Sequence, residues 1–176
     1  GVRVLTPERG RARQMNCGAR HATGDVLLFL HADTTLPASA LNDISTAMRD
    51  PDCPAGRFDV EIEGAHWMLK IVARLINYRS RITKIATGDQ ALFVRRAVFE
   101  TMGGFQDIPL MEDIAFCRAL KRMGPMDCLR TGAITSGRRW ERDGVWRTII
   151  KMWMLKLGYL AGVSPERLKQ YYADTR

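Results

Sequence analysis

The segment that most constrains the fold is an apolar run at residues 26–30, bounded by turn-forming residues on both sides. Gly24 and Asp25 come before it, and His31-Ala32-Asp33 follows it directly. The run is too short for a helix and does not alternate, so it predicts a strand buried on both faces of a sheet. Ligands of open α/β sheets bind beyond the carboxyl ends of the strands. Asp33 is therefore either a functional carboxylate or a residue that caps the turn together with Thr34.

Helical and strand patterns alternate along the rest of the chain. Strands are predicted at residues 2–5, 57–63 and 91–94, and helices at 11–22, 37–48, 67–78, 96–102 and 112–123. This order is typical of α/β proteins. We expect a mixed, mostly parallel sheet flanked by helices, in a single domain over residues 1–176.

The last part of the chain, from about residue 144 to residue 176, predicts an amphipathic helical tail. One helical face carries Trp146, Ile149, Ile150, Trp153, Leu157 and Leu160, with basic residues between them. Such a helix either packs on the domain or lies on an anionic lipid surface. Because no apolar stretch reaches the roughly 18 residues that span a bilayer, we expect a cytoplasmic protein, either free or peripheral to the inner membrane face.

The net charge of +8 indicates an anionic partner. The basic residues are dispersed and accompany no nucleic-acid-binding signature, which argues against nucleic acid. A phosphorylated small molecule or an anionic lipid surface accounts for the charge better. The four cysteines form no C-x-x-C pair, so neither a zinc site nor a redox motif is indicated.

Two further groups of polar residues lie where elements begin. Gly88-Asp89-Gln90 comes just before the strand at 91–94, and Glu112-Asp113 starts the helix at 112–123. Each has an ordinary interpretation, as turn residues or as acids that favour a helix N-terminus. In the functional interpretation, one acid of the Glu-Asp pair serves as general base for an acceptor hydroxyl.

Taken in order, these groups resemble the inverting family 2 glycosyltransferases. The ordered set comprises Gly24-Asp25, the strand that ends in Asp33, Gly88-Asp89-Gln90, Arg95-Arg96, Gly103-Gly104-Phe105 and Glu112-Asp113. The resemblance runs from about residue 3 to residue 140. It looks closest to small bacterial members with a Leu-His-Ala-Asp-Thr strand end, some of which take part in arsenosugar biosynthesis.

The resemblance implies a GT-A fold and a divalent cation, Mg²⁺ or Mn²⁺. Asp33 matches the last acid of the motif that binds metal and nucleotide diphosphate, while His31 stands where the first acid is usual. Asp113 matches the catalytic base, and Glu112 would orient it or touch the acceptor. Asp89, with its neighbours Gly88 and Gln90, matches a position that lines the pocket for acceptor and donor sugar.

Basic residues outside these motifs have weaker matches. The stretch Ser136-Gly137-Arg138-Arg139-Trp140 is similar to the Q-x-x-R-W motif of related processive enzymes. Arg139 would then contact the diphosphate and Trp140 the acceptor, unless the stretch is a solvated basic loop. Arg11 and Arg13 fall where family members contact the nucleotide.

The reaction implied is transfer of a sugar from a nucleotide diphosphate donor to an acceptor hydroxyl. Family members begin with a strand and helix that bind the base and ribose, and nothing before Val2 matches them. We therefore expect a fragment with an open sheet edge and weak or absent activity on its own. Two alternatives are a nucleotidyltransferase on a similar sheet and a non-catalytic module that binds a nucleotide or a membrane surface.

Overall fold

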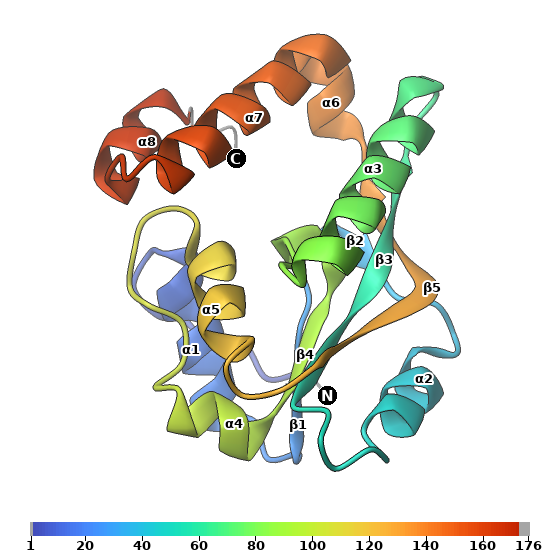
Figure 1. Ribbon diagram of the computed structural model, residues 1–176, viewed down its shortest axis with the longest axis vertical. Helices are drawn as coiled ribbons and strands as arrows, with labels where there is room; N and C mark the ends of the chain where they lie inside the picture. The colour runs from blue at the N-terminus through green and yellow to red at the C-terminus, as the bar shows by residue number, and fades with distance from the viewer. Residues whose placement is uncertain (1, 173–176) are drawn as a thin grey trace.

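The computed structural model describes residues 2–172, which form a curled five-stranded sheet with helices on both faces (Figure 1). The strand order is β1-β4-β3-β5-β2. The strands are β1 (Val26–Phe29), β2 (Thr34–Thr35), β3 (Ala55–Glu63), β4 (Leu92–Arg95) and β5 (Met126–Ser136).

The sheet is mixed, as predicted, but parallel pairing is rarer than expected. Among the described strands, β3 and β5 pair in parallel, and the pairs β1–β4, β3–β4 and β2–β5 are antiparallel. A long crossover of helices joins β3 to β5, which allows a parallel pair. Within this crossover, β4 enters the sheet in the opposite direction, between β1 and β3, and makes both of its pairings antiparallel.

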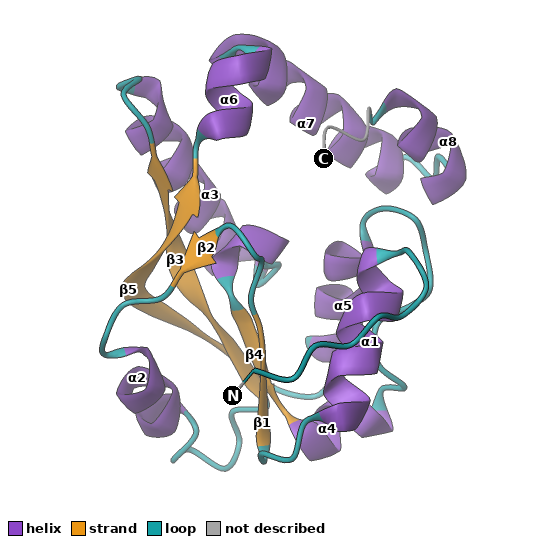
Figure 2. Ribbon diagram, turned by 180° about the vertical axis from the view of Figure 1, so that it is seen from behind, coloured by secondary structure: helices purple, strands orange, loops and turns teal. Residues whose placement is uncertain are grey.

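Helices cover the two faces of the sheet unequally (Figure 2). One face carries α1 (Arg11–His21), α4 (Arg96–Thr101) and α5 (Glu112–Leu120), and the other carries α2 (Ala40–Ala47). Alternation along β4 divides the core accordingly, since Leu92 and Val94 pack toward α1, α4 and α5, whereas Phe93 packs toward α2.

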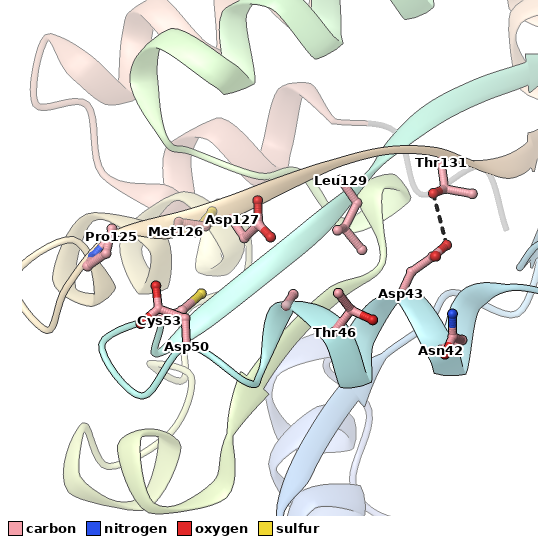
Figure 3. A pocket seen from close by; sticks show the side chains of 11 residues that line it. Asn42, Asp43, Thr46, Asp50, Cys53, Pro125, Met126, Asp127, Leu129 and Thr131 are labelled. Atoms are coloured by element: carbon pink, nitrogen blue, oxygen red, sulfur yellow. Dashed lines mark hydrogen bonds between the residues drawn. The ribbon is translucent and has the colours of Figure 1, made fainter.

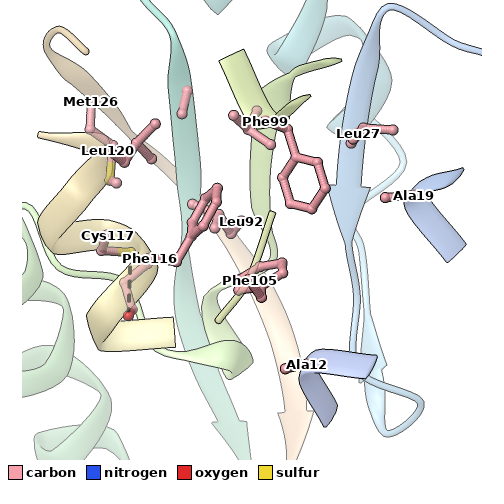
Figure 4. Packing of buried hydrophobic residues seen from close by; sticks show 13 residues of the cluster. Ala12, Ala19, Leu27, Leu92, Phe99, Phe105, Phe116, Cys117, Leu120 and Met126 are labelled. Carbon is pink, nitrogen blue, oxygen red and sulfur yellow. Dashed lines mark hydrogen bonds between the residues drawn. The ribbon is translucent and has the colours of Figure 1, made fainter. Parts of the chain in front are cut away.

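Aromatic rings fill the larger core, on the side of α1, α4 and α5 (Figure 4). Phe105 lies at its centre, with ring centroids 4.4 Å from Phe116, 4.9 Å from Phe29 and 5.6 Å from Phe99. The side-chain amide of Asn16 on α1 donates to the Phe105 carbonyl, at 2.8 Å. These contacts fix α1 against the loop that leads into α5.

The remaining helices form the upper part of the molecule in Figure 1. They are α3 (Met68–Thr83), which runs beside β3, and then α6 (Arg138–Asp143), α7 (Val145–Leu160) and α8 (Pro165–Tyr171). Leu155 of α7 and Leu168 of α8 pack on Leu110, Met111 and Ile114. The C-terminal helices therefore cover the beginning of α5. None of the helices in residues 2–172 has the length and apolar content needed to cross a membrane.

Most predicted elements are found within a few residues of their expected bounds, although α3 continues beyond Tyr78 to Thr83 and the short strand β2 was not predicted. Residues 2–5 form no strand, and Val2 and Val4 are exposed because no described strand pairs with them. The strand β1 is at the edge of the sheet, so of its residues only Leu27 is buried. The longest strand, β5, was not predicted. Residues 1 and 173–176, the ends of the predicted domain and tail, lie outside the described residues.

Candidate active site

The two predicted acidic motifs meet in the structure. The backbone N–H of Gly88 donates to Asp113 Oδ2 at 3.1 Å, and the N–H of Ile114 donates to Asp113 Oδ1 at 2.7 Å. Gly88 belongs to the short 3₁₀ turn η1 (Gly88–Gln90), which leads into β4, and Asp113 belongs to the first turn of α5. A small cavity of about 20 Å³ is lined by His31, Gly88, Glu112 and Asp113 together with apolar residues.

The backbone at both motifs is strained. Ala91, directly after η1, has φ 45°, and Met111, directly before Glu112, has φ 69°. Left-handed backbone is unfavourable for residues other than glycine, and such residues concentrate at functional sites. Both side chains are buried, so the surrounding packing holds these conformations. The strain marks the ends of the two segments that carry the carboxylates.

Glu112 is buried and ion-paired. Its residue is 1% exposed, and Arg11 Nε and Nη2 both contact Glu112 Oε1, while Oε2 has no partner among the described residues. Burial raises the pKa of Glu112, the neighbouring charge of Asp113 raises it further, and Arg11 opposes both effects. The pair thus joins the start of α1 to the start of α5.

Asp89 is paired with His31, which lies two residues beyond the carboxyl end of β1. His31 Nδ1 is 3.4 Å from Asp89 Oδ1. Burial raises the pKa of Asp89, but the hydrogen bond and charge of His31, with Arg11 and Arg139, hold this pKa below its usual value. Burial is the largest single effect on this pKa, but the hydrogen bond and the charges together outweigh it, and 49% of the side chain is exposed. A Cβ on Gly88 would lie 2.3 Å from the His31 ring, so any other residue here would have to displace this ring.

A second hollow, of about 820 Å³, runs along the open edge of β1 and contains Asp33. Its lining includes Arg11, Arg138 and residues 26–33. Asp33 is exposed in the turn after β1, and its carbonyl accepts from Ser136 N–H at 3.1 Å. His31 lines both this hollow and the small cavity with Asp113. Asp33 and Asp113 therefore lie on the same side of the molecule.

The surroundings of Asp33 fit a hard divalent cation. Magnesium is usually bound by one or two carboxylates, with waters and substrate phosphates completing its coordination. Asp33 offers an exposed carboxylate beside a hollow that also carries Arg11 and Arg138. Within residues 2–172 no group of three or more His, Cys, Asp or Glu side chains is placed to hold a metal by itself. A cation here would thus depend on phosphate oxygens of the ligand.

Two cationic side chains near the carboxylates were not predicted. Burial lowers the pKa of Lys156, as does the charge of Arg79, while the charges of Asp113 and Asp89 oppose them. Arg79 Nη2 is buried without a partner among the described residues. The signal for Lys156 in the sequence is weak, since it is one of several basic residues on an amphipathic helix. Its inward position follows only from how α7 packs.

Two residues predicted to bind substrate, Gln90 and Trp140, pack against other side chains of the protein. Gln90 is fully buried, where its Oε1 accepts from Thr87 N–H at 3.2 Å and its side-chain amide donates to Asn77 at 3.4 Å. It supports the η1 turn from inside the core. Trp140 is half-buried against Met68 and Val145. Contact of either residue with a substrate stays a prediction.

The remaining predicted arginine positions differ in their access to the site. Arg139 stacks on Tyr172, with its Cζ 4.6 Å from the ring centroid, and its charge reaches Asp89. Arg13 instead pairs with the exposed acids Asp107, at 2.8 Å, and Glu8. Arg13 does not line the hollow along β1, whereas Arg11 does.

A separate hollow lies between α2 and β5 (Figure 3). Its volume is about 710 Å³, and inside it Thr131 Oγ1 donates to Asp43 Oδ2 at 2.9 Å. It belongs to the sheet face that carries α2, and none of the predicted site residues lines it. The candidate site is therefore the pair of adjoining cavities that share His31.

Comparisons with known proteins bear on the fold and the family of the chain. The structure is similar to a mannosyltransferase from Pyrobaculum calidifontis, solved in complex with GDP-Man and Mn²⁺, with a TM-score of 0.53 and 22% sequence identity. The match covers 72% of this chain and 36% of the solved chain, and it confirms the predicted GT-A fold. No curated protein matches significantly. Residues 1–103 of the 176, more than half of the chain, match the sequence model of glycosyl transferase family 2. The chain therefore belongs to glycosyl transferase family 2.

Proposed function

We propose that the chain is the catalytic part of an inverting, metal-assisted glycosyltransferase, which moves a sugar from a nucleotide diphosphate donor to an acceptor hydroxyl. The observation that carries the proposal is the position of Asp113. Its carboxylate is held by Gly88 at the meeting of the two acidic motifs, beside the hollow that contains Asp33. A base and a diphosphate-binding carboxylate are then on one side of the molecule.

Asp113 would act as the general base. Its two oxygens each accept one backbone N–H, which fixes the carboxylate while leaving further lone pairs free. In a single in-line displacement, the acceptor oxygen bonds to the anomeric carbon as the bond to the diphosphate oxygen breaks. The hydroxyl proton passes to Asp113, and the anomeric configuration inverts. Glu112, through its pair with Arg11, would orient the first turn of α5.

The donor would occupy the hollow along β1. Arg11 and Arg138 line this hollow and suit a diphosphate, because guanidinium groups pair bidentately with phosphate oxygens. Asp33 would hold Mg²⁺ or Mn²⁺, which neutralises the charge that develops on the leaving diphosphate. Asp89, which is paired with His31, and Arg139, whose charge acts on Asp89, would face the sugar and acceptor. The Leu-His-Ala-Asp-Thr strand end supports a place among the small bacterial members of the family.

The test is Asp113→Asn in the complete protein, assayed with a panel of nucleotide sugars. We expect sugar transfer to fall by about 10²–10⁴-fold, since that is the usual contribution of a general base. Donor binding, measured by calorimetry with Mn²⁺, should stay within about twofold, because the amide keeps the shape of the side chain. Glu100→Gln, an exposed acid on α4, is the matched control and should leave both quantities unchanged. Unchanged turnover in Asp113→Asn would exclude Asp113 as the base.

A further inference from the structure

A surface of exposed apolar side chains lies on α3 and α7, outside the candidate active site. We call it the α3–α7 surface. From α3 and the residue before it come Trp67, Ile71, Leu75, Tyr78 and Ile82, and from α7 come Trp146, Ile150, Trp153, Met154, Leu157 and Leu160. Folded proteins rarely leave so many large apolar side chains together in water without a binding role.

The exposure of α7 follows from how this helix packs. Val145, Thr148 and Leu155 are its buried residues, whereas Trp153 and Leu157 are 58% and 56% exposed. The apolar stripe recognised in the sequence therefore points mainly away from the domain. The helix packs on the domain through its narrower face only. The apolar stripe, which is the wider face, is left uncovered.

The charged residues on α3 and α7 are all basic. Neither α3 nor α7 contains an aspartate or glutamate. Lys70 and Arg74 are exposed between the apolar residues of α3, and Arg147 is exposed on α7. The two helices meet at their N-terminal ends, where Met68 and Val145 share one apolar cluster. Apolar and cationic groups are thus combined on two adjoining helices.

We propose that the α3–α7 surface binds an anionic lipid membrane, with the helices lying on it and their apolar residues inserted between the headgroups. Tryptophan and tyrosine side chains prefer this interfacial depth, and lysine and arginine bind anionic lipid. A second copy of the chain suits the surface less well. A symmetric dimer sets the same patch against itself, which would bring cations of both copies together. The inference does not depend on the proposed sugar transfer.

Helix α7 would connect the membrane with the candidate active site. Lys156, on the inner side of α7, is close enough to Asp89 and Asp113 for their charges to affect its pKa. Trp153 and Leu157 on the outer side would contact lipid. One helix therefore carries both Lys156 and the side chains that would contact lipid, so lipid binding would hold the site near the membrane.

The first test is co-sedimentation of the chain with vesicles, either of phosphatidylcholine alone or with phosphatidylglycerol added. We expect binding to the anionic vesicles, at least about tenfold weaker binding to the neutral ones, and loss of binding as salt is raised. Trp153→Ser combined with Leu157→Ser should weaken binding about tenfold or more, because two anchoring side chains no longer enter the lipid. The control is Leu41→Ser, the same type of substitution at an exposed leucine on α2, and it should have no effect on binding.

A second variant tests the charges. Arg74→Glu combined with Arg147→Glu should also lower affinity for the anionic vesicles about tenfold or more, while circular dichroism shows the fold unchanged. Equal binding to neutral and anionic vesicles would overturn the proposal, as would wild-type binding by both double variants. The proposal would also be overturned if the chain did not bind vesicles and instead formed a dimer. In that case the double variant Trp153→Ser and Leu157→Ser would be a monomer. Loss of sugar transfer in other variants has no bearing on these outcomes.

Discussion

Removing Arg11 should strand a buried carboxylate. In Arg11→Met, Glu112 loses the partner of Oε1, and Oε2 already has none among the described residues. Breaking a buried ion pair by removal of one partner costs about 3–5 kcal/mol. Because 30% of the Arg11 side chain is exposed and water already screens part of the pair, we expect the lower end, about 3 kcal/mol at neutral pH.

The cost should depend on pH in a defined direction. Burial and Asp113 raise the pKa of Glu112 in the folded protein, so the folded protein retains a proton that the unfolded chain has released. Stability therefore falls as pH rises through the interval between the unfolded and folded pKa values. Arg11→Met raises the folded pKa further and widens this interval. Its destabilisation should be largest at about pH 8 and shrink toward about pH 5.

The measurement is urea unfolding followed by tryptophan fluorescence, at both pH values. Arg11→Met combined with Glu112→Gln should be more stable than Arg11→Met alone, since no charge is stranded. Arg13→Met, which breaks exposed pairs on the same helix, should cost less than about 1 kcal/mol. A loss below about 1 kcal/mol in Arg11→Met, or one independent of pH, would refute the reasoning.

Three further substitutions test the site and the core. Gly88→Ala should displace the His31 ring, lower stability by about 1–3 kcal/mol and let the pKa of Asp89 rise toward its ordinary value, as carboxyl NMR titration would show. Gly18→Ala, whose Cβ meets nothing within 4 Å in mid-helix, should instead add about 0.5–1 kcal/mol, and the opposite order of the two glycine variants would contradict the packing described. Phe105→Ala should lower the urea-derived stability by about 3–5 kcal/mol, and a loss near zero would mean that the aromatic cluster is not the main core.

The sequence predicts the periodic elements well because their patterns are local. Helix α1 and strand β1 lie within one or two residues of their predicted bounds. The strand β5 could not be predicted because Asp127 and Arg130 interrupt any alternation of apolar and polar residues, and its register with β3 shifts midway. The outward direction of the apolar stripe on α7 could not be predicted either. Periodicity shows that a helix has an apolar face but not what covers that face.

The candidate site could be predicted only in part, for a similar reason. The positions of Asp33, Asp89 and Asp113 in the chain came from ordered motifs, whereas their partners came from the fold. Arg11 and Glu112 are 101 residues apart, so no local pattern could pair them. The inward position of Lys156 depends on the docking of α7, which residue spacing alone does not specify.

The distances along the chain between these partners have a kinetic consequence. The Arg11–Glu112 pair spans 101 residues, the Thr34–Thr135 hydrogen bond also spans 101, and the Asn16–Phe105 hydrogen bond spans 89. Closing such long loops requires a large loss of chain entropy before any of these contacts forms. Helices such as α1 and α3 need only near neighbours and can form early. The pocket would thus be completed among the last steps of refolding, and a ligand could report on the end of folding but not on its beginning.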